Sequence, residues 1–178
     1  MESKNLVELQ NKIHAQNVEM GWWDESRPFH VFVCLFHSEL SEAMEGDRKG
    51  VMDDHLPNYP MFQVELADFV IRCLDWLGNV GHERYDYFTG LVDVSGNCAF
   101  ICEMHSQVSS FVTTMKDPHY KNQEAPNAQL AFAVASCFEY AELQGFDLFQ
   151  IINEKVEYNK HRADHKRENR KLEGGKKY

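Results

Sequence analysis

The chain has 178 residues, 43% hydrophobic and 26% charged, a composition typical of one globular domain with a core of its own. Its formal net charge of -10 argues against a nucleic-acid polymer as the main partner, because a protein that binds a phosphate backbone needs a basic face. There is no run of about 18 uncharged apolar residues, and the N-terminal residues are too polar for a signal peptide. We therefore expect a cytoplasmic protein with no membrane segment.

Apolar residues at helical spacing predict six helices, and no segment has a persuasive strand pattern. The predicted helices span about residues 4–20, 28 to 44 or 45, 60–77, 99–115, 127–144 and 148–169. We expect an all-α fold, a helical bundle built around a four-helix core, in a single domain over residues 1–178. A basic tail follows at about residues 163–178.

Capping residues and prolines define the expected ends of these helices. Ser26 is expected to cap the second helix and Asp147 the last, because their side-chain oxygens can accept bonds from free amides of the first turn. A polar loop is expected over residues 46–58. The Ala125-Pro126 step is expected to lie in a loop, since proline disfavours helix at the residue before it.

The five cysteines are an odd number and include no C-x-x-C pair. Neither a disulfide framework nor a structural zinc site is indicated. We expect reduced and mostly buried thiols.

Two similar acidic segments lie in the second and third predicted helices, Glu39-Leu40-Ser41-Glu42 and Glu65-Leu66-Ala67-Asp68. Acids three residues apart share one side of a helix, and the first acid of each pair borders the apolar stripe. A short loop makes the two helices antiparallel neighbours, so the four carboxylates can converge at their seam. Such a cluster favours a hard divalent cation, Mg²⁺ or Mn²⁺. The alternative is a solvated helix face. A di-iron site is disfavoured because no Glu has a His three residues later.

The last predicted helix carries a face that changes from apolar to cationic. Leu148, Ile152, Lys155, Asn159 and Arg162 follow one another at spacings of four and three. Lys as a point charge, Arg as a bidentate donor and Asn as a neutral donor suit a polyphosphate. A frayed polar helix end is the alternative interpretation.

These motifs resemble the MazG-like all-α nucleoside triphosphate pyrophosphohydrolases, which are related to the dimeric dUTPases. The resemblance is carried by the two E-x-x-E/D segments, by Glu154-Lys155-Val156-Glu157-Tyr158-Asn159 with Arg162, and by the closing Gly174-Gly175-Lys176-Lys177. It covers about residues 5–78 and 128–178. The segment at about 78–127 is longer and reads as an insertion. Where many relatives have Arg-Pro after the Asn motif, this chain has Arg162-Ala163-Asp164.

The resemblance implies Mg²⁺-dependent cleavage of a (deoxy)nucleoside triphosphate to the monophosphate and pyrophosphate. The residues that match the family's Mg²⁺ ligands are Glu39, Glu42, Glu65 and Asp68. Glu39 and Glu42 are the catalytic candidates, with Glu39 as the acceptor of the water's proton. Lys155 and Asn159 match the phosphate contacts, with Arg162 as a third. Asn17 and Trp23 are expected to approach the nucleoside.

Two other functions stay open: a Mg-nucleotide-binding helical module without catalysis, and a helical bundle that binds a partner protein. A small bundle with a polar seam usually buries another face, so we expect a homodimer or a tetramer.

Overall fold

The computed structural model describes residues 3–85, 95–120 and 124–170. Within these ranges the regular structure is helical, apart from an isolated bridge between Met52 and Pro60. The elements are α1 (Ser3–Glu19), α2 (Phe29–Lys49), α3 (Met61–Asn79), α4 (Asn97–Lys116), α5 (Glu124–Gln144), α6 (Leu148–His161), a 3-10 turn (Ala163–His165) and α7 (Arg167–Arg170). The predicted all-α fold is confirmed. Each described helix is too short or too polar to cross a membrane.

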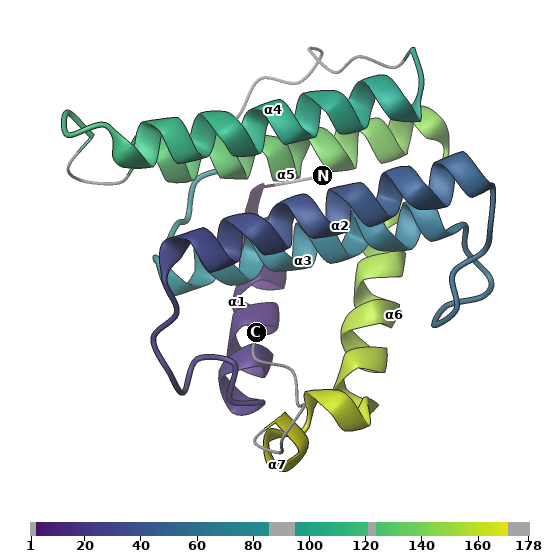
Figure 1. The fold of residues 1–178 in the computed structure, drawn as a ribbon, viewed down its shortest axis with the longest axis horizontal. Coiled ribbons are helices and arrows are strands. Elements are labelled where there is room, and N and C mark those ends of the chain that lie inside the picture. The colour runs from purple at the N-terminus through teal and green to yellow at the C-terminus, as the bar shows by residue number, and fades with distance from the viewer. Residues whose placement is uncertain (1–2, 86–94, 121–123, 171–178) are drawn as a thin grey trace.

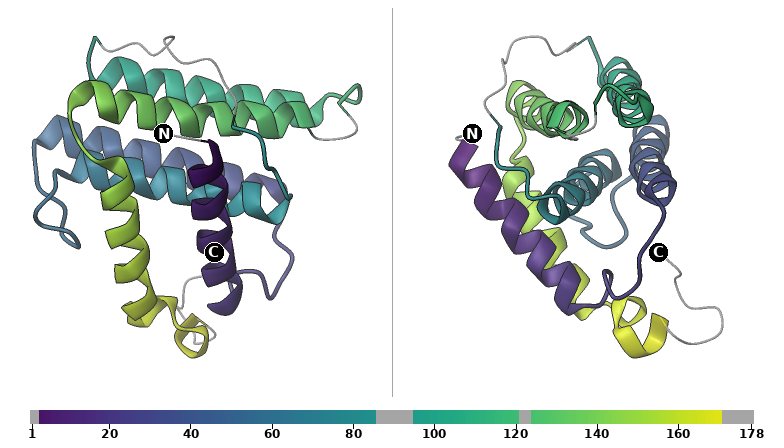
Figure 2. Two further views of the ribbon diagram at one scale, coloured as in Figure 1. Left: turned by 180° about the vertical axis from the view of Figure 1, so that it is seen from behind. Right: turned by 90° about the vertical axis from the view of Figure 1, so that its left-hand side faces the viewer.

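Four helices form the predicted central bundle. α2 lies beside α3 and α4 beside α5, and the two pairs stack so that α2 packs on α4 and α3 on α5 (Figure 1). The end-on view in Figure 2 shows these four helices in cross-section, with α1 and α6 crossing the outer side of α3 at a steep angle. α3 therefore lies at the centre, in contact with α1, α2, α5 and α6.

α3 is the most deeply buried helix of the fold. Leu66, Phe69 and Leu74 are fully buried on it, and Glu65 and Asp75 are also buried, at 7% exposure each. Burial of an apolar side chain of this size stabilises a fold by about 2 kcal/mol. The packed core thus holds two acids of α3 in fixed positions.

α2 continues past its predicted end, through residues 46–49, so the expectation of a loop from Gly46 is wrong. Gly46 lies within the helix, and its missing Cβ permits the close approach of α3. A Cβ at this position would lie 2.8 Å from the side chain of Met61. α2 ends at Gly50, whose φ of 64° is a left-handed conformation that glycine adopts without strain.

The starts of α2 and α5 differ from the sequence expectation, whereas the start of α6 agrees with it. Ser26 does not cap α2, which begins directly after Pro28 without a side-chain cap bond. α5 begins at Glu124 and accommodates Pro126 in its first turn, where the missing N–H has no helical partner to lose. Asp147 caps α6 as predicted and accepts a bond of 2.9 Å from the amide of Gln150.

α6 ends at His161, earlier than the predicted Asn169, because Arg162 is extended. The segment that follows α6 contacts the residues that follow α1. The Arg170 guanidinium lies 3.7 Å from the ring centroid of Trp22 and donates to the carbonyls of Met20 and Gly21. The chain must fold back to make these contacts. The rest of the basic tail, residues 171–178, lies outside the described residues.

All five cysteines are free, as expected, but the expectation that most are buried is wrong. Cys73 and Cys137 are buried, whereas Cys34, Cys98 and Cys102 are exposed on α2 and α4.

Candidate metal and nucleotide site

A cavity of about 310 Å³ opens between α1, α2, α3 and α6. Its volume lies at the lower end of the range of small-molecule sites. The sequence-predicted site residues that line it are Asn17, Glu39, Glu42, Glu65, Asp68, Lys155, Asn159 and Arg162. The structure thus brings residues from three distant parts of the chain to one cavity.

The four acids of α2 and α3 face one another across the seam of these helices. Glu39, Glu42 and Glu65 each offer a carboxylate oxygen, and these oxygens lie within 4.8 Å of one another. Asp68 lines the same cavity, but one of its oxygens pairs with the Lys155 ammonium at 3.0 Å. Convergent carboxylate oxygens are the ligands that Mg²⁺ and Mn²⁺ prefer, so the donor set fits such an ion.

Burial and mutual repulsion perturb the acids at the seam. Burial, followed by the charge of Asp68, raises the pKa of Glu65 to about 8, although Lys155 opposes the shift. Burial also raises the pKa of Glu39, against the opposing effect of Arg72. Without a cation, these carboxylates therefore hold protons at a pH where exposed ones are ionised.

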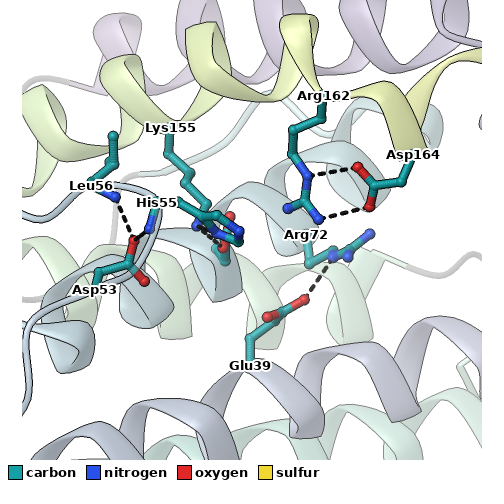
Figure 3. A network of polar contacts seen from close by, with 9 residues as sticks. Glu39, Asp53, His55, Leu56, Arg72, Lys155, Arg162 and Asp164 are labelled. Atoms are coloured by element: carbon teal, nitrogen blue, oxygen red, sulfur yellow. Dashed lines mark hydrogen bonds and ion pairs between the residues drawn. The ribbon is translucent and has the colours of Figure 1, made fainter.

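The opposite wall of the cavity, on α6, provides the cationic and amide groups. Lys155 is 1% exposed, and although burial lowers the pKa of its ammonium, Asp68 outweighs this effect and raises it. Arg162 donates two bonds to Asp164, of 2.8 and 3.0 Å (Figure 3). The Oδ1 atom of Asn159 is buried and has no hydrogen-bond partner among the described residues. A buried acceptor without a partner is rare, and this oxygen can accept a bond from a ligand hydroxyl or amine, whereas a phosphate oxygen would need the Nδ2 group of the same amide.

The loop between α2 and α3 adds His55 to the cavity, which sequence reasoning missed. Asp53 Oδ1 accepts bonds from the amides of His55 and Leu56, at 2.9 and 2.7 Å. The centroid of the imidazole ring lies 5.0 Å from the centroid of the Tyr158 phenol ring. The Nδ1 atom of His55 is 3.5 Å from the Lys155 ammonium (Figure 3). No helical spacing could have placed this loop residue beside α6.

Arg72 is a second residue that the sequence reasoning missed. Its Nε donates to Glu39 Oε1 at 2.9 Å, and Figure 3 shows the two side chains meeting between α2 and α3. A signal was present in the sequence: Arg72 follows Asp68 by four residues, so it had to share the helix face of the acids.

The end of the cavity near α1 is also polar. Asn17 lines it, as expected, beside Gln16, whose Nε2 donates to the carbonyl of Val156. Trp23 lies one layer behind the wall, stacked on Phe32 with ring centroids 5.2 Å apart. Its indole N–H donates at 2.9 Å to Asp75, and Asp75 itself lines the cavity.

No protein-family model matches the chain, and neither a curated protein nor a solved structure matches it. The function must therefore be inferred from the side chains of this cavity.

Proposed function

We propose that the protein is a Mg²⁺-dependent nucleotide pyrophosphohydrolase of the MazG-like type, which cleaves a (deoxy)nucleoside triphosphate to the monophosphate and pyrophosphate. The observation that carries the proposal is the cavity itself, in which carboxylates of α2 and α3 face Lys155 and Asn159 of α6. A metal–triphosphate complex needs this combination, because the acids hold the cation and the cationic wall offsets the phosphate charge.

In this proposal Glu39, Glu42, Glu65 and Asp68 hold Mg²⁺, and Mn²⁺ can replace it. When bound, the ion polarises a phosphoryl oxygen and lowers the pKa of a bound water. Lys155 donates to the phosphates through its ammonium and orients them toward the acids. Arg162 and the amide of Asn159 add donors along the same face of α6.

Glu39 is our candidate for the general base. The residue is 7% exposed, and burial raises the pKa of its carboxylate, which makes it a better proton acceptor near neutral pH than an exposed glutamate. Arg72 bonds one of its two oxygens and so holds the carboxylate in place. Glu42 is exposed, and its Oε1 accepts a bond of 2.8 Å from Ser38 Oγ.

Asn17 is proposed to contact the nucleoside at the α1 end of the cavity. Trp23 acts there through Asp75, which it bonds and positions.

The test is the release of pyrophosphate from a panel of nucleoside triphosphates by the wild type and by the variants Glu42→Ala and Asp68→Ala. We expect both variants to stay folded and to lose activity on the order of 100-fold or more, since each removes a ligand or a partner of the phosphate-binding lysine. Glu45→Gln is a matched control, because Glu45 lies one turn from Glu42 on α2 and pairs with Arg48 and Lys49 instead. Full activity in both alanine variants contradicts the proposal.

A folded wild type that binds Mg-nucleotide without turnover would indicate the binding module instead. A melting temperature that does not respond to Mg²⁺ and nucleotide would indicate a partner-binding bundle.

A further inference from the structure

Two of the four acids in the cavity already have a cation of the protein's own beside them. Arg72 Nε lies 2.9 Å from Glu39 Oε1, and Lys155 Nζ lies 3.0 Å from Asp68 Oδ2. Both pairs are partly buried: the side chains of Glu39 and Arg72 are 10% and 31% exposed, and those of Lys155 and Asp68 are 1% and 17% exposed.

The charges at the seam determine how many further cations it can accept. Once all four acids of the seam are ionised to hold a cation, they and the two paired cations leave two negative charges in excess. Asp75 and Arg162, which also line the cavity, carry opposite charges and do not change this balance. One divalent cation neutralises this excess. A second would leave two positive charges next to Arg27, which also lines the cavity. Uncompensated charge in a partly buried site is strongly unfavourable.

The arrangement of the oxygens agrees with this charge balance. Among the described residues, the group of acids whose oxygens converge within 4.8 Å contains Glu39, Glu42 and Glu65, whereas Asp68 is engaged by Lys155. One group of three carboxylates suits one ion, because Mg²⁺ takes a few carboxylates and keeps water at its other positions.

Arg72 is well suited to act as a fixed internal cation. A guanidinium stays protonated at any physiological pH. Besides Glu39, the carboxylates of Asp68 and Asp75 attract it. Arg72 is therefore held among three acids.

We propose that the site binds one divalent cation per chain and that Arg72, fixed against Glu39, is a positioning residue that takes the place of a second ion. This inference rests on the proposed function, in which the same acids hold Mg²⁺.

The test is the number of Mn²⁺ ions bound per chain, measured by electron paramagnetic resonance on the full chain without nucleotide. We expect one ion for the wild type and one for Arg72→Lys, which keeps the charge. Arg72→Gln removes the charge and frees Glu39, so we expect a second Mn²⁺ ion to bind. Arg48→Gln is the control, because Arg48 is exposed on α2 and pairs with Glu45, and it should leave the number at one.

Two ions on the wild type would overturn this inference and leave the proposed function standing. A single ion on folded Arg72→Gln would also overturn it. If that variant does not fold, the wild-type count still decides the matter. No Mn²⁺ binding by the wild type would contradict both the inference and the proposed metal dependence.

Discussion

Because the pKa of Glu65 is raised, its ionised carboxylate destabilises the folded protein when no cation is bound. Glu65→Gln keeps the shape of the side chain and removes its charge. The folded protein binds the Glu65 proton more tightly than the unfolded chain does, with a pKa of about 8 against 4.5. The free energy of unfolding therefore falls as the pH rises from 4.5 to about 8, and this effect is level above that range.

The size of the effect follows from about 1.4 kcal/mol per pKa unit. In EDTA, Glu65→Gln should be more stable than the wild type by about 1 kcal/mol at pH 5, about 3 kcal/mol at pH 7 and about 5 kcal/mol at pH 9. Urea unfolding followed by circular dichroism measures the difference. Glu142→Gln, an exposed position on α5, is the control and should show no such trend. A variant that is no more stable than the wild type at pH 9 would refute the reasoning. Added Mg²⁺ should stabilise the wild type and so reduce the difference in the free energy of unfolding between the wild type and Glu65→Gln.

Two further substitutions test the packing around the site. Lys155→Met leaves Asp68 without its partner and should lower the free energy of unfolding in EDTA by about 3 kcal/mol. It should also weaken the binding of Mg-nucleotide, which calorimetry measures. Unchanged stability and affinity would contradict the role of this pair. Gly46→Ala places a Cβ 2.8 Å from the side chain of Met61, so α2 and α3 must separate. The substitution should lower the free energy of unfolding by about 1–3 kcal/mol, as measured by thermal unfolding. A stabilised variant would show that the contact is not close.

The helices and the acids of the site could be predicted because their signals are local. Glu39, Glu42, Glu65 and Asp68 stand at helical spacing on helices joined by a short loop, so their convergence follows from periodicity and connection length. The helix ends were harder to predict because tertiary contacts override local preferences. Gly46, for example, ends helices in many sequences, but here it permits the close approach of α3.

The remaining features of the site depend on contacts between distant segments. His55 reaches Lys155 across 100 residues because Asp53 shapes the loop, and no pattern within that loop encodes the pairing. The end of α6 is another case: the chain turns at Arg162, and Arg170 then contacts Trp22, which lies almost 150 residues earlier in the chain. A pattern along one helix does not contain that information.

The most direct test of the central claim is the identity of the products that the wild-type protein forms from a nucleoside triphosphate with Mg²⁺ or with EDTA. The account predicts that ³¹P nuclear magnetic resonance will show monophosphate and pyrophosphate with Mg²⁺ and intact triphosphate with EDTA. Diphosphate and phosphate as the products, or equal turnover in EDTA, would contradict it.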